Sequence, residues 1–146
     1  MSIGKISRTV HRLTDACCAK YNITAKQFVL LVLLAEDDGI TQQEIVERAA
    51  SDPNTIRAML LLLEKNGMVK RGQNITDSRK RHITITQKGR HAYENALKDS
   101  EPIRKQMYES FSNDELKMLK TFLDRLIKSL DEFNIEPHRG PKEDTD

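Results

Sequence analysis

The sequence predicts a mainly α-helical fold with a small β-ribbon, and three observations carry that prediction. Residues 40–50 and 51–67 have the caps and periodicity of two short helices joined by a tight turn. Residues 68–86 alternate like two strands around a basic loop. Amphipathic helical patterns occupy both ends of the chain. Two such helices followed by a β-ribbon are typical of a winged helix-turn-helix domain, and the terminal helices predict a dimerisation domain.

The first part of the chain predicts two helices. Apolar residues recur in 3–20 at gaps of three and four, which places them on one helix face. These residues are Ile3, Ile6, Val10, Leu13 and Cys17. Thr24 can cap the next helix, with Gln27 at the partner position of a capping box. Because 24–36 is apolar on every side, we expect it to be the buried central helix, ended by a left-handed turn at Gly39.

Local signals also define the two helices of the helix-turn-helix. Thr41 and Glu44 predict a capping box at the start of the first. Asp52 is a good N-cap for the second, and Pro53 at its first position needs no amide partner. Gly67 closes this helix. Its periodicity predicts a core face made of Ile56, Met59, Leu60 and Leu63.

Polar residues at the start of these helices have the chemistry to contact DNA. Asn54 lies where a recognition helix presents side chains to bases, and Asn pairs with adenine as Arg57 would with guanine. Thr55 suits a phosphate or a thymine methyl. Thr41 and Gln42, with a helix N-terminus behind them, suit a backbone phosphate. The alternative for each is ordinary solvated surface.

Leu61 and Leu62 lie outside the core stripe of the second helix. A face toward solvent or DNA is not expected to carry leucines. Three roles stay open for them, which are packing on the ribbon, lining a ligand cavity, and contacting a partner.

The ribbon holds the sharpest local signal. An Asp two residues before an Arg can accept its guanidinium and orient it, so we expect Arg79 to enter a narrow minor groove with Asp77 as its orienter. Lys80 and Arg81 then serve phosphates, and Arg71 on the first strand joins the predicted DNA contacts. The alternative is an exposed surface ion pair of little energetic value.

The C-terminal part predicts two more helices. Thr86 caps a long one, which we expect to break near Ser100 because Pro102 follows. Ser112 and Glu115 form a third capping box. A heptad-like seam, widened by Phe122 and Ile127, could pack on its own core or on a second copy of the chain. We favour dimerisation through Ile6, Val10, Leu13, Leu116, Leu119, Leu123, Leu126 and Leu130.

Charge is distributed unevenly along the chain. The formal net charge is only +2, yet the segment from Arg48 to Arg90 holds ten basic and three acidic residues. A positive segment on a negative body is the electrostatic pattern of a DNA-binding protein. No apolar run is long enough to span a membrane, and the N-terminus does not have the pattern of a secretory signal, so we expect a cytoplasmic protein.

Little in the sequence favours catalysis. The four histidines are scattered, and no metal-ligand spacing, phosphate loop or nucleophile motif occurs, so we expect no metal, no cofactor and no enzyme. The adjacent cysteines Cys17 and Cys18 are expected to be buried, reduced thiols on a helix. A thiol-based redox-sensing regulator is the alternative that they leave open.

The chain resembles the MarR family of bacterial transcriptional regulators over about residues 5–133. The resemblance implies a homodimer that binds an operator, usually represses, and is often released by a small ligand between the dimerisation helices and the DNA-binding lobe. Two departures are that Ala58 stands where the family often has Arg, and that Leu61 and Leu62 replace residues that are usually polar. The matching positions are Leu63, Glu64, Gly67, Met68, Val69, Arg71, Asp77, Arg79, Ile85, Thr86 and Gly89.

Together these signals predict a homodimeric transcriptional regulator of a palindromic duplex site. We expect dimerisation helices in 1–22 and 90–133, a winged helix-turn-helix DNA-binding domain in 23–89, and a disordered tail in 134–146. A winged-helix protein-interaction module is the alternative from another functional class. Its contact surface would include Leu61 and Leu62, and it would not require the basic ribbon.

Overall fold

The computed structural model describes residues 2–73 and 81–132. These divide into two compact units between Lys105 and Gln106. The predicted tail, 134–146, lies outside the described residues. In chain order the elements are α1 (Ser2–Cys18), a 3-10 turn η1 (Ala19–Tyr21), α2 (Ala25–Glu36), β1 (Ile40–Thr41), α3 (Gln42–Ala49), α4 (Pro53–Lys65), β2 (Val69–Gln73), β3 (Arg81–Ile85), α5 (Gln87–Tyr108) and α6 (Asn113–Asp131).

The three predicted capping boxes are all confirmed. Thr24, Thr41 and Ser112 each accept a hydrogen bond from the backbone N–H three residues later, and the side chain at that position bonds back to the cap. These reciprocal bonds satisfy amide groups that a helix start leaves without intrahelical partners. Gly39 and Gly67 adopt the left-handed conformation, with φ of 82° and 72°.

The three strands form one antiparallel sheet in the order β1-β3-β2. Val69 pairs with Ile85 and Arg71 with Ile83 across β2 and β3, as the sequence predicts for a ribbon. Strand β1, which has only two residues and pairs Ile40 with Ile83, was not predicted from the sequence. A strand of this length has no alternation to detect, and its partner is more than 40 residues away along the chain.

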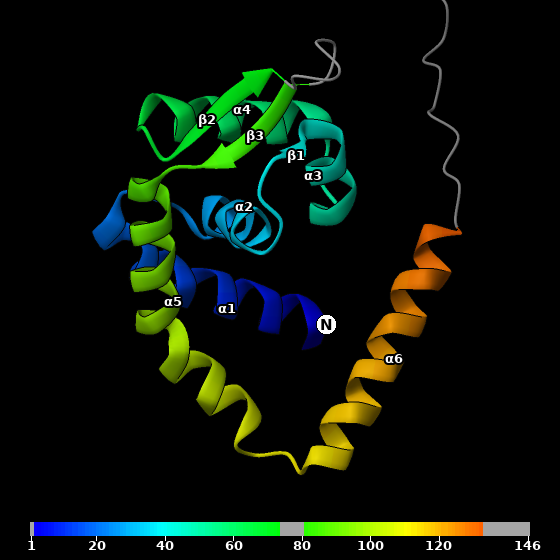
Figure 1. Cartoon of the computed structure of the whole chain (residues 1–146). Helices are drawn as coiled ribbons and strands as arrows, with labels where there is room; N and C mark the ends of the chain where they lie inside the picture. Colours follow the sequence, from blue (N-terminus) through cyan, green and yellow to red (C-terminus); the bar gives the residue numbers. More distant parts are fainter. Residues whose placement is uncertain (1, 74–80, 133–146) are drawn as a thin grey trace, which may run out of the picture. The chain divides into compact units, whose positions relative to one another are not determined.

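The core of the first unit surrounds α2, which contacts α1, α3, α4 and β3 (Figure 1). The expectation that α2 is buried on every side is wrong, because Val29 is 47% exposed. The neighbouring elements leave one side of the helix uncovered. The largest fully buried side chains of this core are Leu30, Leu31, Leu34, Ile45, Ile56, Leu60, Leu63, Val69 and Ile83.

The expected helix break near Ser100 is also wrong, because α5 runs from Gln87 through Pro102 to Tyr108. A proline removes one intrahelical hydrogen bond, and the turns on both sides of it maintain the helix here. Ser100 is buried, and its hydroxyl donates to the Leu97 carbonyl at 3.0 Å.

Within the described residues, no single helix is long and apolar enough to cross a membrane. Together α1 and α2 reach the necessary length and composition, but they are bent by 75° at their junction.

Candidate nucleic-acid interface

The helix-turn-helix is closed by a tight turn between α3 and α4. Ala50 adopts a left-handed conformation with φ of 46°, which is uncommon for a residue other than glycine. Asp52 then caps α4 by accepting the Thr55 N–H at 2.9 Å. Hydrogen bonds from the Thr55 side chain and backbone hold the pKa of this carboxyl below its usual value. The start of α4 is therefore fixed by groups within its own first turn.

The two faces of α4 differ sharply. Ile56, Leu60 and Leu63 are fully buried and hold the helix against the core, as predicted. Asn54 and Arg57 are exposed on the other face, and Thr55 is half-buried between the two. The structure thus presents the two predicted base-contacting side chains on a helix that is anchored from behind.

The predicted phosphate contacts at the start of α3 are less exposed than Asn54 and Arg57. Thr41 and Gln42 are both half-buried. The Thr41 hydroxyl donates to Glu44 Oε2 at 2.6 Å, and its backbone N–H donates to the same oxygen at 2.7 Å. The Thr41 side chain is consequently engaged in the helix cap.

Arg71 lies inside the domain rather than on the open face. Its Nε is 3.2 Å from Glu64 Oε2, which joins β2 to α4. The side chain is only 19% exposed, and Nε and Nη2 are buried. This pairing leaves little of Arg71 for DNA, and it also neutralises the one acidic side chain near the C-terminal end of α4. Sequence spacing gave no signal of the contact.

The basic loop joins the ends of β2 and β3. Asp77, Arg79 and Lys80 lie outside the described residues. Arg81 is the first residue of β3, and its backbone pairs with Gln73 at the far end of β2. The wing contacts predicted from sequence therefore stay predictions.

The base of the ribbon is held by contacts that the sequence does not predict. His82 Nδ1 is hydrogen-bonded to the Gly39 carbonyl oxygen. The Gly39 N–H donates to the Ile83 carbonyl at 3.1 Å, and the Ile85 N–H donates to Asp38 Oδ1 at 2.9 Å. These bonds fix β3 to the segment that leads into α3, so the ribbon and the helix-turn-helix form one body.

The start of α5 is joined closely to the end of α4. The Thr86 hydroxyl donates to the Gly67 carbonyl at 2.7 Å, and the Thr86 N–H donates to the Met68 carbonyl at 3.0 Å. Gly89 packs so tightly here that a Cβ atom would lie 2.0 Å from the Met68 oxygen. Lys88 also donates to the Asn66 carbonyl, at 2.7 Å. These hydrogen bonds hold the C-terminal end of α4 against the first turn of α5.

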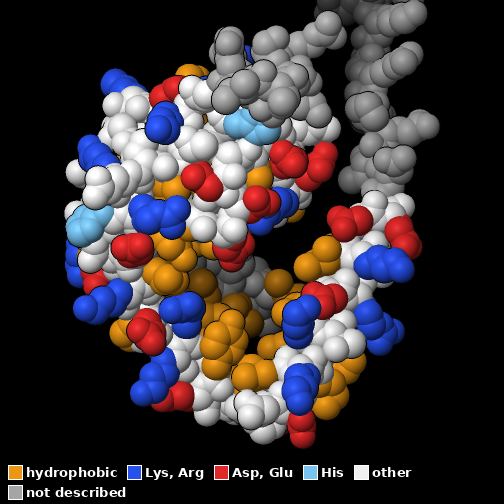
Figure 2. Space-filling model, in the orientation of Figure 1, with side chains coloured by type: hydrophobic (Ala, Val, Ile, Leu, Met, Phe, Trp, Pro, Cys, Tyr) orange, Lys and Arg blue, Asp and Glu red, His pale blue; other side chains and the backbone are white. Residues whose placement is uncertain are grey.

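In the described residues, the predicted dimerisation side chains range from half-buried to exposed. On α1, Ile6 is 57% exposed, whereas Val10 and Leu13 are half-buried. On α6, Leu116 is half-buried and the rest of the seam is exposed, up to 71% at Leu130. Figure 2 shows apolar side chains among the charged ones along α6. The exposed seam residues of α6 are Leu119, Phe122, Leu123, Leu126, Ile127 and Leu130.

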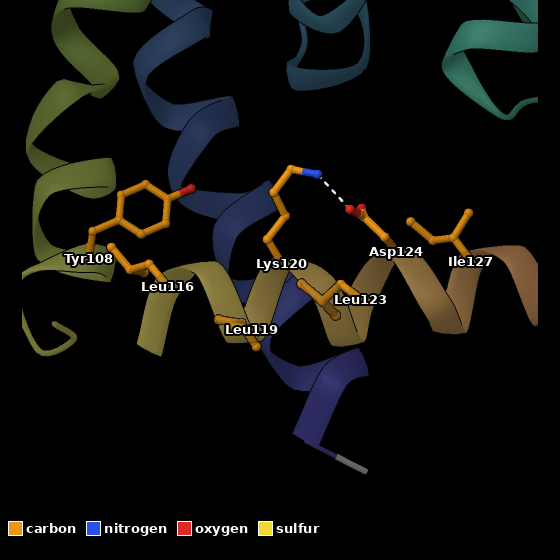
Figure 3. Close-up of a pocket in the computed structure, with 7 residues that line it drawn as sticks. All are labelled: Tyr108, Leu116, Leu119, Lys120, Leu123, Asp124 and Ile127. Carbon is orange, nitrogen blue, oxygen red and sulfur yellow. Dashed lines mark hydrogen bonds and ion pairs between the residues drawn. The ribbon is translucent and has the colours of Figure 1, made fainter. Parts of the chain in front are cut away.

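The second unit also contains an apolar groove of about 480 Å³. Figure 3 shows leucines of α6 along it, with the ion pair between Lys120 and Asp124 at one side. Its lining residues are Tyr108, Leu116, Leu119, Lys120, Leu123, Asp124 and Ile127.

Both cysteines are free. Cys18 is completely buried, and burial raises the pKa of its thiol to about 11. Because the thiolate is the reactive form, Cys18 is poorly suited to redox sensing. Cys17 is half-buried and donates to the Asp99 carbonyl at 3.5 Å. Among the residues that the structure describes, no group of His, Cys, Asp or Glu could hold a metal ion.

Comparison with known proteins agrees with this architecture. The family model for the transcriptional regulator SarA/Rot matches residues 12–96. The HTH-type transcriptional regulator MgrA of Staphylococcus aureus is 28% identical over 132 residues, which cover 90% of this chain and 88% of that protein. The family and this relative are transcriptional regulators, not enzymes.

Solved structures confirm the fold. The transcriptional regulator SlyA superposes with a TM-score of 0.82 at 24% identity, covering 90% of this chain and 92% of that one. MepR of S. aureus, in a complex with DNA, gives a TM-score of 0.80 at 22% identity, covering 87% of this chain and 94% of that one. These likenesses confirm the winged-helix architecture that the sequence indicates.

Proposed function

This chain belongs to the SarA/Rot family of transcriptional regulators, and from that premise we propose that it binds a palindromic duplex operator as a homodimer. The observation that carries the proposal is the outer face of α4. Asn54 and Arg57 are exposed there, while the inner face of the same helix is fully buried. A rigidly held helix with exposed amide and guanidinium groups is suited to reading base edges in a major groove.

The dimer is supported by the open apolar seam of α6. Leu123, Leu126 and Leu130 are 41%, 50% and 71% exposed. Pairing with the same helix of a second copy would remove these side chains from water, which is favourable at about 25 cal/mol per Å² of apolar area. A two-fold dimer would then present two copies of α4 to successive major grooves about 34 Å apart.

The wing completes the proposed contact with DNA. Arg79, oriented by Asp77, is assigned to the minor groove, and Lys80 and Arg81 are assigned to phosphates. The support is the sequence pattern together with the ribbon that leads into it, since β2 and β3 pair from Val69–Ile85 to Gln73–Arg81. The output we propose is repression in the cytoplasm, released by a small molecule, as the MarR resemblance implies.

Arg57 provides the sharpest test of the recognition helix. We expect Arg57→Ala to weaken operator binding by about 1–3 kcal/mol, which is roughly a 5- to 150-fold rise in Kd, and to reduce the preference for the operator over an unrelated duplex. Fluorescence anisotropy with the DNA upstream of the protein's own gene measures both quantities. Affinity and preference that stay at the wild-type level would remove Arg57 from the base contacts.

Lys65→Ala is the matched control for this experiment. Lys65 is exposed on the same helix about two turns later, and its loss changes the net charge equally. We expect this variant to retain the preference for the operator and to lose affinity, if at all, equally on both duplexes.

Arg79 tests the wing independently. We expect Arg79→Ala to weaken operator binding by about 1–3 kcal/mol, because a groove contact is lost. Lys70→Ala on β2 removes the same charge outside the loop and is the control. Titrations at several salt concentrations separate a lost phosphate contact, which lowers the salt slope by about one, from a lost groove contact. An Arg79→Ala protein with wild-type affinity would refute the wing assignment.

A further inference from the structure

Two leucines on α4 have no role in the core. Leu61 and Leu62 are 49% and 51% exposed, although Leu60 and Leu63 on either side of them are fully buried. Leaving two large apolar side chains in water is unfavourable, and among the residues that the structure describes none covers them, so their position favours a contact with a partner.

Helix geometry separates the two residues. Leu61 follows Arg57 by four positions and Asn54 by seven, so all three lie along the same face of α4. Ala58 and Lys65 flank this line and are also exposed. Leu62 lies about 100° further round the helix, toward the side of Thr55. Leu61 is therefore central on the face proposed to enter the groove, and Leu62 is at its border.

The charges around Leu61 favour nucleic acid over an apolar protein partner. Arg57 and Lys65 are exposed one turn before and one turn after it. Glu64, the acidic residue of this half of the helix, is paired with Arg71 at 3.2 Å. The surface around Leu61 is consequently positive, which complements the phosphates that border a groove.

The major groove offers one apolar group to such a side chain, the 5-methyl of thymine. We propose that Leu61 is a specificity-determining residue that contacts a thymine methyl, with the small side chain of Ala58 allowing close approach. This inference rests on the proposed function of α4. It assigns the protein a preference for thymine at a position about 10 Å along the helix axis from the base read by Asn54.

The test removes the methyl group without changing the pairing of the base. The probe is a duplex that the wild-type protein selects from a random library, prepared once with thymine and once with uracil throughout. We expect uracil to raise the wild-type Kd about fourfold for each methyl that is contacted, the effect of losing one buried methyl-sized group. Leu61→Ala should lose the part of this discrimination that its own methyl contact contributes, about fourfold for each contact.

Leu62→Ala is the control, since it shortens an equally exposed leucine on the same helix and should still discriminate between the duplexes. If uracil weakened binding by changing the shape of the DNA, the loss of affinity would be as large in Leu61→Ala as in the wild type. A loss that is smaller in Leu61→Ala therefore reports the methyl contact. Equal binding of both duplexes by the wild type, or full discrimination by Leu61→Ala, would overturn the inference while operator binding stands. If the wild type selects no duplex, the proposed function fails as well, and the protein-interaction module accounts better for these leucines.

Discussion

Replacing Leu123 and Leu126 together by Asp is expected to convert the proposed dimer into a monomer and to weaken operator binding by at least about 100-fold. Burying a leucine contributes about 1.5–3 kcal/mol, and in a symmetric interface each change acts twice. The two carboxylates would in addition lose hydration without gaining a partner. A monomer retains only one recognition helix and so loses half of the proposed base contacts.

Loss of the dimer can be distinguished from unfolding of the first unit, because α6 contributes no residue to the core of that unit. The buried cluster of the first unit extends from Cys18 to Ala96 and includes no residue of α6. The double variant should therefore retain the thermal transition of the first unit. Size-exclusion chromatography with light scattering measures the mass, and circular dichroism measures the fold.

The control places two new carboxylates on the opposite face of α6, at Thr121 and Lys128, where the second change also removes a positive charge. Both residues are exposed, and they lie roughly opposite the Leu123–Leu126 seam in helical projection. Thr121→Asp with Lys128→Asp should leave the mass unchanged. A Leu123→Asp, Leu126→Asp protein that keeps the mass of a dimer would contradict the assignment of this face.

Gly89→Ala is expected to lower the free energy of unfolding by about 2–3 kcal/mol, even though alanine is the better helix former. The added Cβ would lie 2.0 Å from the Met68 oxygen and 2.9 Å from the Met68 carbonyl carbon. Both atoms are backbone, so no side-chain rotation can relieve the overlap. The same oxygen accepts the Thr86 N–H, and this bond would be strained as α5 moved away.

Gly72→Ala is the control for this change, because a Cβ there meets no atom within 4 Å. Urea unfolding, monitored by circular dichroism, should show a lower midpoint for Gly89→Ala and a nearly unchanged midpoint for Gly72→Ala. Equal urea midpoints for wild type and Gly89→Ala would show that α5 can move away from the Met68 backbone without a loss of stability.

The features that sequence predicted well are local ones. A capping box such as Thr41 to Glu44 is complete within four residues, and its hydrogen bonds depend on no distant part of the chain. The left-handed turns at Gly39 and Gly67 are local in the same sense. The core face of α4 also follows from periodicity, because Ile56, Leu60 and Leu63 repeat at helical spacing.

The features that sequence missed depend on contacts between distant segments. Strand β1 forms because Ile40 pairs with Ile83, more than 40 residues away along the chain. The incomplete burial of Val29 depends on which sides of α2 the neighbouring elements cover. None of these contacts leaves a periodic trace in the sequence.

The candidate site also contains some residues whose position follows from local sequence and others whose position depends on distant contacts. Asn54 and Arg57 could be placed on the open face from helix geometry alone, and the structure places them there. Arg71 resembled a DNA contact in sequence, but the fold brings its Nε within 3.2 Å of Glu64. The close packing of Gly89 on Met68 likewise follows from how α5 meets the turn between α4 and β2, although the glycine itself belongs to the family pattern.

We propose that two copies of this chain read a two-fold symmetric duplex through α4. Selection of bound duplexes from a random library, followed by sequencing, is the decisive experiment. We expect an enriched inverted repeat whose half-sites are centred about 10–10.5 base pairs apart, the spacing of two recognition helices on one side of the DNA. Enrichment of a single unrepeated motif, or no enrichment above the input library, would contradict it.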